Sequence, residues 1–167
     1  MNILELFAPI RTFVFDVDGV LTEGSLLLTE DGHMLRRMDV KDSYALRHAV
    51  TSGFAVWVIS HGKSEVVRLW LHELGVGEVH FGIDNKKEFL EGLVRKSNTH
   101  YETILYMGDD IPDYAAMQLC ALPSCPNDAV NEVKQVAKYI SPFNGGKGCV
   151  RDVIEKVMKL NEHWELP

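Results

Sequence analysis

The sequence predicts an α/β protein with a doubly wound parallel sheet enclosed between two helical layers. Short apolar runs such as Thr12–Val17 and Phe54–Ile59 alternate with amphipathic segments, a pattern typical of buried parallel strands joined by helices. The length of 167 residues suits one domain, and no repeat, low-complexity tract or linker divides the chain. We therefore expect residues 1–167 to form one three-layer α/β/α domain of Rossmann-like topology.

The first strand is expected to lead into a β-hairpin and then a helix. Thr12–Val17 is β-branched, aromatic and too short for a helix. The hairpin spans about 24–38, where Leu26–Thr29 and His33–Met38 flank the turn signal Glu30-Asp31-Gly32. Asp42 is expected to cap a helix that Gly53 ends.

The rest of the chain predicts strands and helices in alternation. Apolar residues at helical spacing favour a helix over Lys63–Leu74, which follows the buried strand Phe54–Ile59. The later expected elements are a strand at Glu78–Phe81, a helix at Lys86–Lys96, a strand at Thr103–Met107, helices at Ile111–Leu119 and Asp128–Ala137, a proline-bearing strand between Cys120 and Cys125, and a helix at Gly148–Leu160 within a C-terminal tail of about 144–167.

Composition excludes several classes of partner. Lys and Arg total 17 against 24 Asp and Glu, and the net charge of −7 argues against nucleic acid and anionic membranes, which require clustered basic residues. The charge-free stretch His48–Gly62 is shorter than the ~20 apolar residues of a membrane span, and the N-terminal stretch lacks the basic residues of a signal peptide. An odd number of cysteines without a metal-site pattern favours free thiols in a reducing cytoplasm.

Carboxylates gather just after two expected strands, where parallel sheets bind their ligands. Asp16 and Asp18 end the first strand and face the same side, whereas Asp109 and Asp110 follow another strand and Asp113 lies one helical turn later. Two carboxylates about 4 Å apart repel by ~4 kcal/mol at an effective dielectric constant near 20. A cation offsets this repulsion, and oxygen ligands of this kind suit Mg²⁺.

Two other interpretations of the acidic motif are weaker. Asp-x-Asp-Gly also begins an EF-hand loop, but here it follows a strand, and Leu27 stands where the loop requires Glu. The receiver domain of a phosphorelay also combines clustered aspartates with a lysine. Its phosphoacceptor lies on a middle strand, whereas Asp16 lies on the first, so that interpretation ranks second.

These residues resemble a known enzyme family. The motifs that carry the resemblance are Asp16-Val17-Asp18-Gly19-Val20-Leu21-Thr22, Ser60, Lys86 and Gly108-Asp109-Asp110-x-x-Asp113. Together they resemble the haloacid dehalogenase (HAD) superfamily of phosphatases, and more closely its small capless branch that contains 3-deoxy-D-manno-octulosonate 8-phosphate (KDO 8-phosphate) phosphatase. The likeness to this branch covers nearly the whole chain and extends to the loop Gly145-Gly146-Lys147-Gly148. It implies a HAD core with a hairpin inserted after the first strand and no cap domain.

The resemblance also implies a Mg²⁺-dependent mechanism and the roles of the acidic residues. Asp16 would be the nucleophile that forms an aspartyl-phosphate, and Asp18 the general acid and then the general base. The Asp16 carboxylate, the Asp18 backbone carbonyl and Asp109 would hold Mg²⁺. Asp110 or Asp113 would orient water or Lys86.

The expected substrate-binding residues follow from the same resemblance. Ser60 would bind a phosphate oxygen and Lys86 would neutralise charge on the phosphate and nucleophile, with His61 and Arg68 as further substrate contacts. Each has a structural alternative, since Ser60 could cap the following helix and lysines usually lie on the surface. If Lys86 does not serve, Lys87 is the fallback.

The implied substrate is a sugar-acid phosphate, most specifically KDO 8-phosphate in lipopolysaccharide precursor synthesis. Alternatives are a nine-carbon sialic-type sugar acid 9-phosphate, or a non-catalytic module that retains the fold. Family members often have Thr-Gly-Arg where this chain has Ser60-His61-Gly62, and Trp70 replaces another common basic residue. A sugar carboxylate needs a cationic partner, and the remaining candidates are Arg36, Arg37, Lys63, Arg68 and Arg151.

A capless subunit needs another means of closing its site. The apolar run Leu26–Leu28 would be partly exposed in a monomer, and the resembling family suggests a homotetramer in which the hairpin packs between subunits. The family also uses the tail that begins near Gly145 to close a site, sometimes that of a neighbouring subunit. The simpler interpretation of the Gly145–Gly148 loop is a flexible surface turn.

Overall fold

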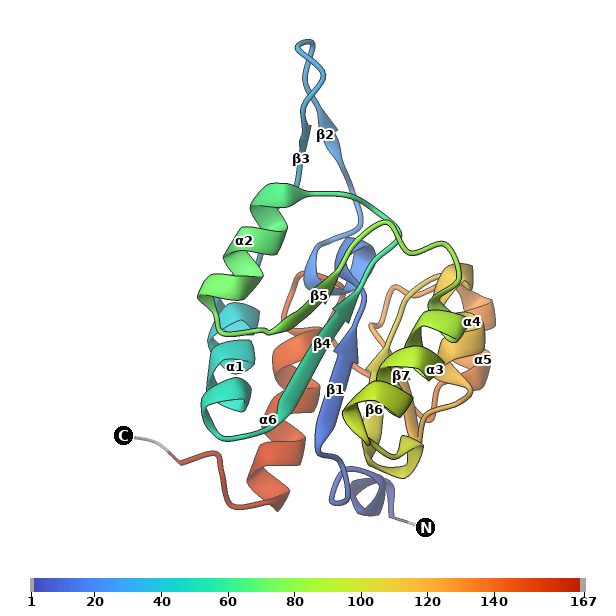
Figure 1. The fold of residues 1–167 in the computed structure, drawn as a ribbon. Helices are drawn as coiled ribbons and strands as arrows, with labels where there is room; N and C mark the ends of the chain where they lie inside the picture. Colours follow the sequence, from blue (N-terminus) through green and yellow to red (C-terminus); the bar gives the residue numbers. More distant parts are fainter. Residues whose placement is uncertain (1, 166–167) are drawn as a thin grey trace.

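A six-stranded parallel sheet forms the centre of the protein, seen here in a computed structural model that describes residues 2–165 (Figure 1). Its strand order is β5-β4-β1-β6-β7-β8, and every neighbouring pair is parallel. The strands are β1 (Thr12–Phe15), β4 (Ala55–Ile59), β5 (Glu78–His80), β6 (Ile104–Met107), β7 (Leu122–Cys125) and β8 (Tyr139–Ile140). The predicted doubly wound fold is thus confirmed.

Both faces of the sheet are buried, which explains the continuous apolar runs. In β1, Phe13 and Phe15 belong to one core and Val14 to the other, as the two-residue period of a strand requires. The helices α1 (Val40–Thr51), α2 (Glu65–Glu73) and α6 (Cys149–Leu160) cover the first face. The helices α3 (Lys86–Ser97), α4 (Ile111–Met117) and α5 (Asn131–Val136) cover the second (Figure 1).

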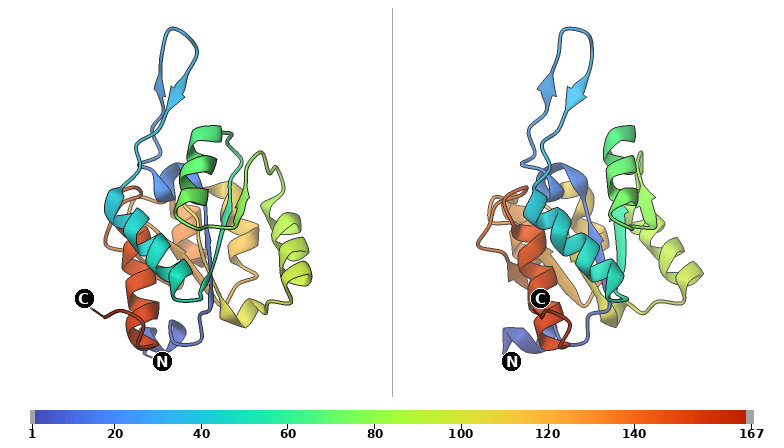
Figure 2. Two further views of the ribbon diagram at one scale, coloured as in Figure 1. Left: turned by 60° about the vertical axis from the view of Figure 1, so that its left-hand side comes forward. Right: turned by 90° about the vertical axis from the view of Figure 1, so that its left-hand side faces the viewer.

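The hairpin projects from the carboxyl edge of the sheet, away from the body of the domain (Figure 2). The chain turns tightly over Val17–Leu21 and then forms β2 (Leu27–Leu28) and β3 (Met34–Leu35). These antiparallel strands are shorter than the sequence predicts. All four of their residues are exposed, by 49 to 68%, so within residues 2–165 no second layer covers the ribbon.

The prediction that Asp42 caps the first helix is wrong. Asp39 is the cap and accepts hydrogen bonds from the backbone N–H groups of Lys41 and Asp42, so α1 begins at Val40. Asp42 is buried in the first turn, where it accepts a hydrogen bond from the Arg151 N–H at 2.8 Å. It thereby satisfies a free donor at the start of α6 and joins the two helices.

The sequence does not predict β8 or the 3₁₀ turns at Ile3–Leu6 and Tyr101–Thr103. The described end of the tail packs against α1 of the same chain, with Trp164 edge-on to the rings of Tyr44 and His48. Within residues 2–165, no helix combines the length and apolar character that a membrane span requires.

Candidate active site

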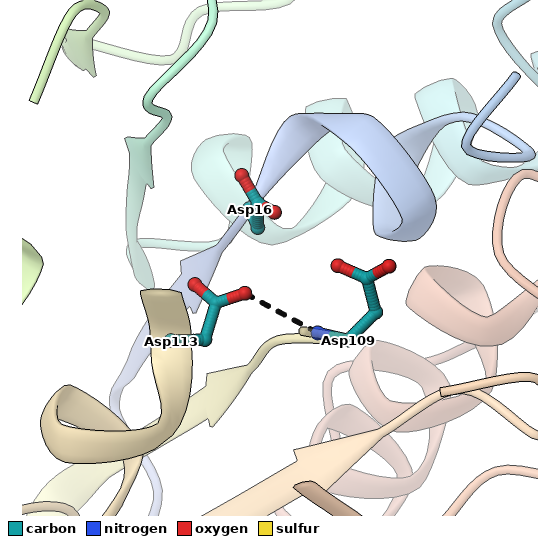
Figure 3. A group of neighbouring side chains, drawn as sticks. All are labelled: Asp16, Asp109 and Asp113. Carbon is teal, nitrogen blue, oxygen red and sulfur yellow. Dashed lines mark hydrogen bonds between the residues drawn. The ribbon is translucent and has the colours of Figure 1, made fainter. Parts of the chain in front are cut away.

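Three carboxylates meet at the carboxyl edge of the sheet (Figure 3). Asp16 directly follows β1 and Asp109 follows β6, and these strands pair with Phe15 opposite Met107. The register therefore brings the two residues beyond the strand ends together. Asp113 joins them from the first turn of α4, so that one oxygen from each carboxylate lies within 4.8 Å of the others.

Gly19 makes this close approach possible. Its φ of +92° is favourable only for glycine, and a Cβ atom here would lie 1.9 Å from Oδ2 of Asp109. The turn after β1 can therefore pass directly over the Asp109 carboxylate. In the Asp16-Val17-Asp18-Gly19 motif, the glycine serves the geometry of the acidic cluster.

Lys86 places a positive charge among these carboxylates. It begins α3, whose cap is Asn85, and its Nζ lies 2.9 Å from Oδ1 of Asp16 and 2.7 Å from Oδ1 of Asp113. Burial alone would lower the pKa of this lysine, but the charges of Asp113 and Asp16 outweigh it and raise the pKa. Lys86 is 2% exposed, so it is not a surface lysine.

Tyr106 makes a hydrogen bond to Asp113, the ion-pair partner of Lys86. This contact is not predicted from the sequence. The Tyr106 hydroxyl donates a hydrogen bond of 2.9 Å to Oδ1 of Asp113, while the Asp109 N–H donates one of 3.3 Å to Oδ2 (Figure 3). Burial and the Asp113 charge raise the Tyr106 pKa well above its ordinary value. The signal in the sequence is a tyrosine within an apolar strand, because a buried tyrosine hydroxyl usually needs a hydrogen-bond partner.

The acidic cluster concentrates negative charge in a buried place, and a bound cation would offset that charge. Burial, followed by the charge of Asp113, raises the pKa of Asp16 to about 7, and burial with the charge of Asp16 raises that of Asp109 to about 8. Oδ1 of Asp109 is buried and, among the described residues, has no hydrogen-bond partner. These hard oxygen donors fit a divalent cation such as Mg²⁺.

A cleft of about 730 Å³ opens above the cluster. The predicted site residues that line it are Asp16, Asp18, Ser60, His61, Lys86, Asp109, Asp110 and Asp113. His61 lies at the exposed rim with Nδ1 3.2 Å from Asp84. Arg68 is not among the lining residues and pairs with Glu65 on α2.

Ser60 does not cap the following helix, because Ser64 caps α2 by accepting a hydrogen bond from the N–H of Val67. Ser60 is 1% exposed and lines the cleft at the end of β4. Asp110 caps α4 through the N–H of Ile111, so it has a local structural role beside the cleft.

The Gly145–Gly148 loop packs against the turn that follows β1. A Cβ at Gly145 would lie 2.0 Å from the carbonyl oxygen of Gly19, and the Gly146 N–H donates to the Val20 carbonyl at 2.9 Å. Both glycines are buried. This part of the loop therefore supports the turn that covers Asp109.

Comparison with known proteins places this site in a family, although no family model matches the chain. KDO 8-phosphate phosphatase KdsC of Escherichia coli (strain K12) is 32% identical over 157 residues, which cover 92% of this chain and 84% of the relative. A structure of the KDO 8-phosphate phosphatase of Moraxella catarrhalis in complex with magnesium, phosphate and KDO superposes with a TM-score of 0.91 at 29% identity, covering 95% of this chain and 91% of that one.

A HAD superfamily (subfamily III A) hydrolase of Legionella pneumophila superposes with a TM-score of 0.92 at 27% identity, covering 96% of this chain and 88% of that one. Each of these alignments covers at least 92% of this chain. The chain therefore belongs to the phosphatases of the haloacid dehalogenase superfamily, in the family that contains KDO 8-phosphate phosphatase.

Proposed function

We propose that this phosphatase is Mg²⁺-dependent and hydrolyses KDO 8-phosphate to KDO and inorganic phosphate. The observation that carries the proposal is the Asp16 carboxylate, which lies 2.9 Å from the buried Lys86 ammonium at the base of the cleft. The magnesium, phosphate and KDO in the similar Moraxella structure support the choice of cofactor and substrate.

Asp16 is the proposed nucleophile. Its oxygen attacks phosphorus and forms an aspartyl-phosphate while the bond from phosphorus to the sugar oxygen breaks. Asp18, two residues further on and also lining the cleft, protonates the departing oxygen. It then takes a proton from the water that hydrolyses the intermediate.

Other residues of the chain stabilise charge in this reaction. Asp16, Asp109 and the Asp18 backbone carbonyl would hold Mg²⁺, which when bound supplies positive charge to the phosphoryl oxygens. Lys86 neutralises the nucleophile and phosphate, and the Ser60 hydroxyl binds a phosphoryl oxygen. This arrangement suits phosphoryl transfer, which depends mainly on positioning and electrostatics.

Asp113 and Asp110 have different proposed roles. Asp113 accepts from Lys86 and Tyr106 at once, so it orients Lys86 and leaves Asp16 and Asp109 for the metal. Asp110 helps to position water at the cleft. His61 is proposed to contact the substrate at the rim of the cleft. Arg68 does not line the cleft of its own chain, so it would contact the substrate only beyond that cleft.

The test is phosphate release from a panel of esters with and without Mg²⁺. The panel contains KDO 8-phosphate, a nine-carbon sialic-type acid 9-phosphate and p-nitrophenyl phosphate. We expect Mg²⁺-dependent release, highest with KDO 8-phosphate and abolished in Asp16→Asn. Preference for the nine-carbon acid would replace the substrate, unchanged release in Asp16→Asn would refute the mechanism, and inactivity on every ester would favour a non-catalytic module.

The proposed assembly is a homotetramer in the cytoplasm. Leu27 and Leu28 on β2 are 65% and 68% exposed, and a second copy of the hairpin would cover them. Buried thiols at all three cysteines are consistent with a reducing compartment. Light scattering is expected to give four chains. A mass equal to one 18.8 kDa chain would contradict the tetramer.

A further inference from the structure

An ion pair connects the hairpin to the site. Arg36 lies just after β3, and its Nε and Nη2 donate to the two carboxylate oxygens of Asp18 at 2.7 and 3.2 Å. The Arg36 side chain is 4% exposed and the Asp18 side chain 32%. This two-point geometry is the strong form of a guanidinium–carboxylate pair. Arg36 is thus a nearly buried guanidinium whose two N–H donor groups face a carboxylate in the cleft.

Gly62 leaves room for this pair. A Cβ atom at position 62 would lie 2.8 Å from Oδ2 of Asp18 and 3.2 Å from Nη2 of Arg36. The loop after β4 thus presents no side chain where the two charged groups meet. Because both groups line the cleft, the space beside them is open to a bound molecule.

The charges that line the cleft show why Arg36 matters for an anionic substrate. They comprise the aspartates Asp16, Asp18, Asp84, Asp109, Asp110 and Asp113 and the cations Arg36, Lys63 and Lys86. Lys86 is held by Asp16 and Asp113, where phosphate is expected to bind. A second anionic group on the substrate would meet mostly negative charge and needs another cation. Of the two remaining cations in the cleft, Lys63 is exposed, whereas the Arg36 side chain is nearly buried and paired with Asp18.

We propose that Arg36 recognises the carboxylate of the sugar-acid substrate by exchanging partners. In the resting cleft the guanidinium holds Asp18, and on binding it turns to the substrate carboxylate, which offers the same pair of oxygens. The exchange frees the Asp18 side chain to approach the leaving oxygen. A phosphate ester without a carboxylate leaves Asp18 held by Arg36 and is a poor substrate. This inference rests on the proposed function and specifies how its substrate is selected.

Binding measurements test the inference without relying on catalysis. With Mg²⁺ present, calorimetry would compare KDO and inorganic phosphate as separate ligands of the whole protein. Arg36→Ala is expected to weaken KDO binding on the order of 100-fold, the loss typical of hydrogen bonds between charged groups. Phosphate binding should change less than threefold. Arg36→Lys, which keeps the charge but loses the fork, should lie between wild type and Arg36→Ala.

Kinetics supply a second readout on matched substrates. Arg36→Ala should lower kcat/KM for KDO 8-phosphate, but leave it unchanged or raise it for arabinose 5-phosphate, a sugar phosphate without a carboxylate. Arg47→Ala, on α1 and outside the cleft, is the control for loss of one positive charge and should preserve the substrate ratio. Circular dichroism checks the fold of each variant.

Equal loss on both substrates, or KDO binding that does not depend on Arg36, would overturn the inference. Failure of the proposed function is distinguishable, because the wild-type protein would then release no phosphate from any ester while the binding comparison still reports on Arg36. Wild-type preference for arabinose 5-phosphate over KDO 8-phosphate would also overturn the inference, since no carboxylate would then be selected.

Discussion

The Lys86 ammonium lies 2.9 Å from the Asp16 carboxylate, and neither side chain is more than 10% exposed. Asp113 binds the same ammonium at 2.7 Å. A single cation thus compensates two buried carboxylates, and within residues 2–165 neither acid has another ion-pair partner. Removing such a partner leaves uncompensated buried charge, which costs far more than the net contribution of the pair itself.

Lys86→Met should therefore impair both activity and stability. We expect kcat to fall about 10²- to 10³-fold, as when a preorganised charge-stabilising group is lost. The free energy of unfolding should fall by about 3–5 kcal/mol. Phosphate release and urea unfolding measure the two effects. Lys87→Met is the matched control, because Lys87 is exposed and does not line the cleft; a larger loss of activity in Lys87→Met would contradict the assignment.

The sequence predicted that these residues lie close together, because their proximity depends on topology. Asp16 follows β1, Asp109 follows β6, and Lys86 begins α3 after the β5 region. In a parallel sheet such positions share one edge, so finding the apolar runs is enough to bring them together. The same reasoning could not place Arg68, since the direction of a side chain on α2 depends on the angle at which that helix packs.

Mg²⁺ binding should be linked to pH. Without metal, burial raises the pKa of Asp16 to about 7 and that of Asp109 to about 8, above the ordinary value of 3.8. The folded protein then binds more protons than the unfolded chain, so metal-free stability should fall as pH rises from about 4 to 8. Mg²⁺ competes with these protons and should bind more tightly as pH rises to about 8.

Thermal unfolding with and without Mg²⁺ at about pH 5.5 and pH 8 checks this linkage. The increase in Tm on adding Mg²⁺ should be larger at the higher pH. Asp109→Asn should lose most of the increase at both values. An increase that is the same at both pH values in the wild-type protein would mean that these carboxylates do not exchange protons for the metal.

Gly19→Ala should disrupt the site more than the same change at Gly32. Both glycines have positive φ, +92° and +88°, so backbone strain is similar at the two positions. Of the two, only Gly19 would bring the new Cβ against another group, 1.9 Å from Oδ2 of Asp109. A Cβ at Gly32 would have no heavy atom of the described residues within 4 Å apart from its chain neighbours. Gly32→Ala should cost about 1 kcal/mol from strain.

In Gly19→Ala the Asp109 carboxylate must move, so we expect a further loss of stability and at least a tenfold weaker affinity for Mg²⁺, about 1.4 kcal/mol. Urea unfolding and calorimetric Mg²⁺ titration measure these effects. Equal Mg²⁺ affinity in the two variants would show that the Asp109 position is not set by contact with the turn.

Contacts made by irregular segments were beyond sequence reasoning. Arg36 reaches Asp18 because the hairpin leaves the sheet edge and returns over it, and no periodic pattern specifies that path. Asp42 was expected to cap its own helix but binds the start of α6, more than a hundred residues away. Local signals such as helix caps identify what a residue can do, whereas tertiary packing selects its partner.

Tyr106→Phe provides a test of the support beneath Lys86. The Tyr106 hydroxyl donates to Oδ1 of Asp113 at 2.9 Å, and a phenylalanine would leave that oxygen with Lys86 alone. Because Asp113 is charged, we expect the free energy of unfolding to fall by about 1.5–3 kcal/mol. Activity should fall less than tenfold, since Lys86 keeps both carboxylates and the effect reaches Asp16 only through Asp113.

Urea unfolding and steady-state kinetics measure these two quantities. Tyr101→Phe is the matched control, because its hydroxyl makes no side-chain hydrogen bond within residues 2–165 and Tyr101 is half-buried. Equal stability of the two variants would show that the Tyr106 hydroxyl does not stabilise Asp113. A loss of activity as large as that of Lys86→Met would place Tyr106 in the reaction itself, because removal of a positioning group leaves the Lys86 charge beside the nucleophile.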